Sequence, residues 1–131
     1  MPVDSILDAA RAGLDYERLR LDAASRNIAN ANVPVAPGQA AQQWQVLTAG
    51  IQPGGLQSAD ALTTQAPMAT RDVHDPANPM ADAHGNVRYP AVDLVQEMTT
   101  LMSASRGYEA NVRSFNLLRG MMLHALEIGA K

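Results

Sequence analysis

The sequence predicts a mainly α-helical protein, in which long N-terminal and C-terminal helices pair as an elongated coiled-coil-like hairpin. Between them it predicts a small, loop-rich and partly β insertion. Three observations support this fold class: a 4-3 apolar repeat over the last third of the chain, a seven-residue apolar repeat near the start, and a middle that holds most of the prolines.

The C-terminal helix is predicted over residues 93–128. A long helical repeat begins at Leu94 and continues in alternating steps of four and three: Leu94, Met98, Leu101, Ser105, Tyr108, Val112, Phe115, Arg119, Met122, Leu126 and Gly129. At about 1.5 Å per residue, such a helix is about 54 Å long, whereas a compact domain of this size has a diameter of about 36 Å. We therefore expect the helix to project, to pair lengthwise with another helix, or both.

The N-terminal helix is predicted over residues 4–31. Its main apolar row recurs every seven residues and consists of Leu7, Leu14, Leu21 and Ile28. Asp4 or Ser5 is expected to cap its start, and Asp15 with Arg18 and Asp22 with Arg26 have the spacing of helical ion pairs. We expect it to end near residues 30–32, because Pro34 disfavours helical backbone in the residue before it.

The middle of the chain is predicted to be an insertion over residues 33–90, between an N-terminal helical segment (1–32) and a C-terminal one (91–131). Seven of the eight prolines lie there. Strands are expected at residues 43–51, 68–74 and 86–89, with loops at 33–42, 52–65 and 75–85.

Composition excludes several classes of function. A net charge of −3 offers no basic surface for nucleic acid. There is no cysteine, which excludes disulfides and thiolate metal sites. No apolar run approaches the roughly 20 residues of a membrane span, and the N-terminus lacks the pattern of a cleaved signal peptide.

The last turns of the C-terminal helix predict a multi-chain assembly. Apolar residues between Leu117 and Ile128 cover almost the whole circumference, which is typical of a helix buried on several sides. One partner helix from the same chain cannot cover them. We therefore expect helices that are disordered in the monomer and become ordered on docking.

Two motif blocks resemble a known family. The C-terminal block contains "NPMADAHGNVRYP", "VDLVQEM", "SASRGYEANV" and "ALEIG", and the N-terminal block contains "AASRNIANANVP". Together they resemble the proximal rod proteins of the bacterial flagellar basal body, the FlgC type of the flagellar axial proteins. The residues that carry the resemblance include Asn27, Asn30, Asn32, Asp93, Glu97, Ser105, Arg106, Tyr108 and Asn111.

The resemblance implies a structural subunit of the axial rod that crosses the periplasm and transmits torque. Its implied partners are copies of itself, other rod subunits and the flagellar type III export apparatus, which would export it without a cleaved signal. No nucleic acid, small-molecule substrate, cofactor, metal or catalytic site is implied. The assembly residues are expected to be Leu7, Leu14, Leu21, Ile28, Leu94, Met98, Leu101, Tyr108, Val112, Phe115, Met122 and Leu126.

A helical adaptor or export chaperone is the alternative of a different class. The apolar period and composition also suit a soluble dimer that binds partner helices in a groove. A stably helical dimer in solution would favour that reading, and a weakly helical monomer would favour the rod subunit.

An enzyme is the remaining alternative. Several carboxylates and imidazoles lie close together in the sequence and could bind a divalent metal ion: Asp72, His74, Asp75, Asp82 and His84. Proline and glycine beside them instead favour turn and cap roles. Helical spacing likewise favours packing over metal binding for the methionines of the C-terminal helix.

Overall fold

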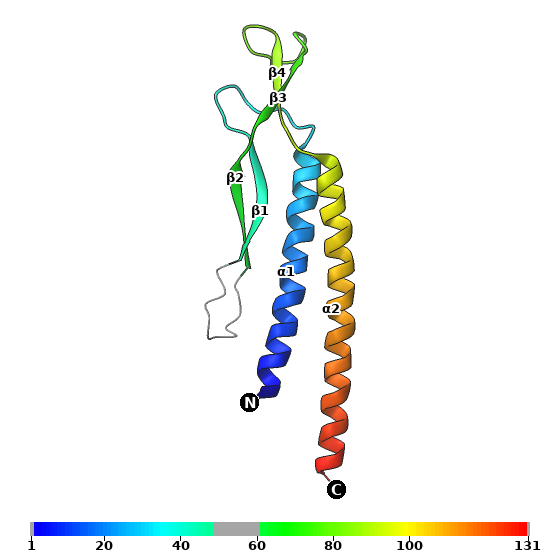
Figure 1. Ribbon diagram of the computed structural model, residues 1–131. Helices are drawn as coiled ribbons and strands as arrows, with labels where there is room; N and C mark the ends of the chain where they lie inside the picture. The colour runs from blue at the N-terminus through cyan, green and yellow to red at the C-terminus, as the bar shows by residue number, and fades with distance from the viewer. Residues whose placement is uncertain (1, 49–60, 131) are drawn as a thin grey trace.

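The computed structural model describes residues 2–48 and 61–130 of the protein. Two long antiparallel helices, α1 (Pro2–Asn30) and α2 (Leu94–Gly129), lie side by side, and α2 extends beyond the start of α1 (Figure 1). Two β-hairpins lie between them in the chain. The predicted fold class, a paired-helix hairpin with a small partly β middle, is confirmed.

The ends of the helices follow local sequence signals. Asp93 caps α2, because its Oδ1 accepts the backbone N–H groups of Val95 and Gln96 at 3.0 and 3.1 Å. The N-terminal helix ends at Asn30, within the expected range and before Pro34. Its start differs from expectation, because α1 begins at Pro2, two residues before Asp4. Proline suits the first helical position because an N–H group there would have no hydrogen-bond partner within the helix, so its absence costs little.

Strand β1 (Gln42–Thr48) pairs antiparallel with β2 (Ala61–Pro67). This hairpin runs along α1 (Figure 1). The strand expected at residues 43–51 is therefore present as far as Thr48, and residues 49–51 lie outside the described part. Strand β2 was not expected, since its first five residues fall in the predicted loop at 52–65. It has no apolar alternation, and it forms because β1 supplies backbone partners.

Strands β3 (Thr70–His74) and β4 (Asn86–Pro90) form a second antiparallel hairpin. It stands where α1 ends and α2 begins (Figure 1). Arg71 links this hairpin to the end of α1, since its guanidinium donates to the Asn32 side chain at 3.1 Å. Within the hairpin, the same guanidinium lies 5.0 Å from the ring centre of Tyr89. Both predicted strands are present, although Met68 and Ala69 precede β3 rather than belonging to it.

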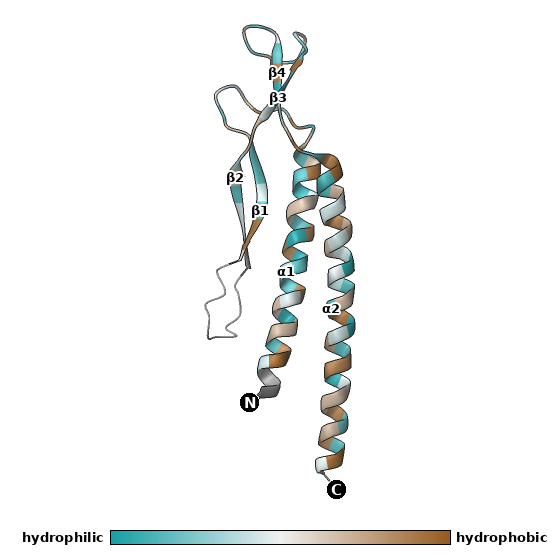
Figure 2. Cartoon of the chain, in the orientation of Figure 1, coloured by the Kyte–Doolittle hydropathy of each residue, from teal (hydrophilic) through white to brown (hydrophobic). Residues whose placement is uncertain are grey.

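The buried core consists mainly of small residues. The buried apolar residues in the described part of the chain are Ala23, Ala24, Ala31, Ala41, Val87 and Ala104. Larger apolar residues gather elsewhere: Figure 2 shows them along α2, and the C-terminal half of that helix carries many of them. This distribution is the reverse of that in an ordinary globular domain.

Candidate assembly surface

The two helices contact each other through small and polar residues. A methyl group at Gly107 would lie 2.8 Å from the carboxyl carbon of Glu17, and one at Gly13 would lie 3.1 Å from Nδ2 of Asn111. Farther along, the Asn27 amide donates to Oε1 of Glu97 at 3.2 Å. We call these three the seam pairs: Gly13 with Asn111, Glu17 with Gly107, and Asn27 with Glu97.

The seam pairs differ from the apolar rows that the sequence singled out. They use Asn27 rather than Ile28, Glu97 rather than Met98, and Asn111 rather than Val112. One residue corresponds to about 100° around a helix. The apolar rows are therefore turned away from the line of closest contact, because glycine and alanine allow a closer approach than leucine or methionine.

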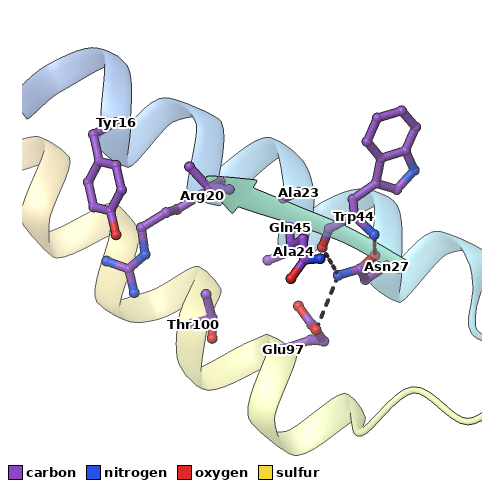
Figure 3. Close-up of a pocket in the computed structure, with 10 residues that line it drawn as sticks. Tyr16, Arg20, Ala23, Ala24, Asn27, Trp44, Gln45, Glu97 and Thr100 are labelled. Atoms are coloured by element: carbon purple, nitrogen blue, oxygen red, sulfur yellow. Dashed lines mark hydrogen bonds between the residues drawn. The ribbon is translucent and has the colours of Figure 1, made fainter. Parts of the chain in front are cut away.

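Asn27 joins three elements at one point. Its side chain is buried, accepts the Trp44 N–H at 2.7 Å, and donates to the Trp44 carbonyl at 2.9 Å as well as to Glu97 (Figure 3). The guanidinium of Arg26 lies 4.5 Å from the Trp44 ring centre. This Asn27 junction ties β1 to both helices and satisfies the polar groups that it buries.

A cavity of about 200 Å³ opens beside the Asn27 junction. Its described lining comes from α1, α2 and β1 (Figure 3) and consists of Tyr16, Arg20, Ala23, Ala24, Asn27, Trp44, Gln45, Val46, Glu97 and Thr100. The polar groups of this lining include the Glu97 carboxylate, the Arg20 guanidinium and the hydroxyls of Tyr16 and Thr100. The cavity therefore offers both hydrogen-bond donors and acceptors.

Burial raises the pKa of the Glu97 carboxyl above its ordinary value, and the hydrogen bond from Asn27 opposes this shift. Because the folded pKa exceeds the unfolded one, near 4.5, the stability from this group is fully present below the unfolded pKa. It is lost as pH rises through the raised folded pKa.

Glu97→Gln should remove this pH dependence while retaining Oε1 as an acceptor for Asn27. The wild type should become less stable relative to the variant as pH rises above 4.5. This difference in the free energy of unfolding should level off once pH exceeds the raised pKa of Glu97. Urea unfolding followed by Trp44 fluorescence measures it, since Trp44 is the only tryptophan. Parallel pH profiles for the two proteins would contradict the partial burial of Glu97.

Large apolar side chains are exposed along α2. In its C-terminal half, Leu117 is 68% and Ile128 78% exposed, and near its start Val95 is 76% exposed. We call the exposed large apolar residues of this helix the α2 stripe: Leu94, Val95, Met98, Met102, Tyr108, Leu117, Met121, Leu123, Leu126 and Ile128. Exposed apolar side chains in this number are typical of a protein interface.

The predicted assembly residues lie in two environments. Eight of them are half-buried within the single chain: Leu7, Leu14, Leu21, Ile28, Leu101, Val112, Phe115 and Met122. Exposed are Leu94, Met98, Tyr108 and Leu126. Two thirds of the predicted assembly residues are thus partly covered by the chain itself, and the other third is open to solvent.

The residues of the family motif are also divided. Asn27, Glu97 and Asn111 belong to seam pairs, and Asp93 caps α2. Asn30, Asn32 and Arg106 are exposed, and Ser105 is half-buried. Sequence reasoning did not single out Gly13, Glu17 or Trp44. Two glycines inside otherwise helical segments, Gly13 and Gly107, were the available signal of a close helix contact.

The aspartate and histidine run of the middle segment lies around the β3–β4 hairpin. Oδ1 of Asp82 accepts the backbone N–H groups of His84 and Asn86, which lowers the pKa of this carboxyl. His74 instead contacts the Asn86 side chain. In residues 2–48 and 61–130, no three histidine, aspartate or glutamate side chains are arranged as metal ligands.

The charged residues of α1 form local pairs. Asp22 and Arg26 lie 3.0 Å apart, as their spacing predicts. The expected Asp15–Arg18 pair is not formed, and Glu17 with Arg20 at 2.9 Å takes its place. Glu17 thus both neutralises Arg20 and fills the space over Gly107.

Comparison with known proteins places this arrangement in a family. Residues 83–128 match the family model described as the C-terminal part of the flagellar basal body rod FlgEFG proteins. The flagellar basal-body rod protein FlgC of Escherichia coli O6:H1 is 41% identical over 135 residues, which cover 98% of this chain and 99% of that protein. The chain belongs to the FlgC family of flagellar basal-body rod proteins.

Further FlgC relatives extend across distant bacteria. FlgC of Salmonella typhimurium is 39% identical, with 98% of this chain and 99% of the relative covered. FlgC of Bacillus subtilis is 33% identical, with 94% and 95% covered. The relatives are named as rod proteins, so the family is structural rather than enzymatic, and the adaptor reading is not favoured. In the described part of the chain, neither helix combines the length and hydropathy of a membrane span.

Proposed function

We propose that this chain is a structural subunit of the flagellar basal-body rod. It assembles with copies of itself and with other rod subunits through α1 and α2. Membership in the FlgC family supports this function. The lengthwise pairing of two helices that are longer than an ordinary globular domain of this size is wide also supports it. A contact repeated between different surfaces of successive subunits generates a tube, which suits an axial structure.

The observation that carries the proposal is the distribution of apolar side chains. The contact between α1 and α2 uses glycine, alanine, asparagine and glutamate, whereas the α2 stripe faces outward. Burying apolar surface is favourable by about 25 cal/mol per Å². A subunit whose larger apolar residues lie outside therefore gains its main hydrophobic stabilisation from neighbouring subunits.

Several finer features belong to the same proposal. The rod crosses the periplasm and transmits torque, and the subunit reaches it through the flagellar type III export apparatus without a cleaved signal. Residues 1–32 and 91–131 form the assembling helical part, and residues 33–90 form the insertion. The assembly residues are the predicted apolar rows, and the family-motif residues position the two helices.

Purified basal bodies test the function. Mass spectrometry after detergent and alkaline washing should recover this chain at a level comparable to that of other rod components. A deletion strain, which should also be non-motile, provides the control. Recovery of the chain in the cytosolic fraction alone, as a stably helical dimer by circular dichroism, would contradict the proposal and favour the adaptor.

A further inference from the structure

The three seam pairs share a single antiparallel alignment. The residue steps from Gly13 to Glu17 to Asn27 along α1 equal the steps from Asn111 back to Gly107 and Glu97 along α2. The same alignment places Ala24 opposite Thr100, and both line the cavity beside the Asn27 junction (Figure 3). Three separate contacts therefore specify one register.

Two of the seam pairs are reciprocal. In one pair, α1 supplies the glycine and α2 the polar side chain, and in the other pair these roles are exchanged. Glycine is a poor helix former, so its presence inside both helices needs a reason. Gly13 and Gly107 have that reason in the side chains packed against them, whereas Gly120 has open space around it within the chain.

Glu17 is held in place over Gly107. Its carboxylate accepts a hydrogen bond from Nη1 of Arg20 at 2.9 Å, and the Glu17 side chain is only 15% exposed. Arg20 in turn lies 5.7 Å from the ring centre of Tyr16. Moving the carboxylate away from Gly107 would disturb this half-buried ion pair.

We propose that the Gly13–Asn111 and Glu17–Gly107 pairs set the register of the helix hairpin. They thereby determine which apolar residues remain outside for neighbouring subunits, and in this respect the inference rests on the proposed function. A slip of four residues would instead place the Glu17 side chain against Asn111 or Ser103, neither of which is a glycine. Polar residues within a helix seam are known to specify register in this way.

Engineered cysteine pairs can measure the register, because the natural chain has no cysteine. Ala24→Cys with Thr100→Cys reports the observed alignment. Ala24→Cys with Ala104→Cys reports a slip of one helical turn, since a disulfide requires Cα atoms within about 7 Å. The ratio of the two cross-linking yields is compared in the wild-type background and in three backgrounds: Gly107→Ala, Gly107→Ala with Glu17→Ala, and Gly120→Ala.

Gly107→Ala should lower this ratio by about tenfold, a change typical of adding one methyl group to a tight contact. Adding Glu17→Ala removes the overlapping carboxylate and should restore the ratio. Gly120→Ala makes the same chemical change in open space and should leave it unaltered. The double variant separates loss of register from general misfolding, because misfolding would not be rescued by a second truncation.

Cross-linking is carried out on the full-length chain in both the soluble fraction and basal bodies. An unchanged ratio in Gly107→Ala, or failure of Glu17→Ala to restore it, would overturn the register proposal. Equal cross-linking of both cysteine pairs in the wild-type background would do the same. Absence of the chain from basal bodies would instead contradict the proposed function, and the soluble fraction would still report the register.

Discussion

Replacing Leu117 by aspartate should abolish incorporation of the chain into basal bodies while leaving the stability of the isolated chain nearly unchanged. Leu117 is 68% exposed in the single chain, so a carboxylate there remains hydrated. In the proposed rod, the same position is covered by a neighbouring subunit, and burying an unpaired charge costs several kcal/mol. Motility and the amount of the chain in purified basal bodies measure the effect.

Asn116→Asp provides the matched control for this variant. It adds the same carboxylate at the preceding residue, which is already polar and exposed. We expect near-normal incorporation from this control. Normal motility of the Leu117→Asp strain would show that the α2 stripe is not an assembly surface, while a large loss of stability in the isolated chain would show that Leu117 is packed within the subunit.

Asn27→Ala should release the β1–β2 hairpin from the helices. The substitution leaves the backbone N–H and carbonyl of Trp44 and the carboxylate of Glu97 without their partner. Loss of buried hydrogen bonds of this kind costs about 3 kcal/mol in total. Amide hydrogen exchange at Trp44 and the fluorescence of this single tryptophan should both report increased opening.

Asn30→Ala tests whether this effect is specific to the Asn27 junction. Asn30 belongs to the same motif but is exposed at the end of α1, so its loss should cost no more than about 0.5 kcal/mol. If the Trp44 amide exchanges as slowly in both variants as in the wild type, the hairpin must be held by apolar packing rather than by Asn27.

Local sequence signals predicted much of the architecture. The 4-3 apolar repeat defined α2 nearly to its ends, and Pro34 marked the region where α1 stops. These signals succeed because helix formation, capping and termination depend on residues within one or two turns of each other. Strand β2 was missed for the complementary reason, since a short strand without apolar alternation depends on a partner for its existence.

The site was less accessible to sequence reasoning. Asn27 and Glu97 appeared only as members of a family motif, and their hydrogen bond joins residues 70 positions apart. Trp44 was not singled out at all. Their common role at the Asn27 junction required the path of the chain through β1, which no local pattern encodes.

The sequence by itself determined that two long amphipathic helices form, that they pair, and that their apolar surface exceeds what one chain can bury. Only the tertiary structure decided how each helix is rotated. Periodicity shows how apolar residues repeat around one helix. It does not show which of several faces with a similar repeat will contact the partner helix. Close approach at Gly13 and Gly107, and hydrogen bonding at Asn27, select a polar face for the contact and leave much of the α2 apolar surface exposed.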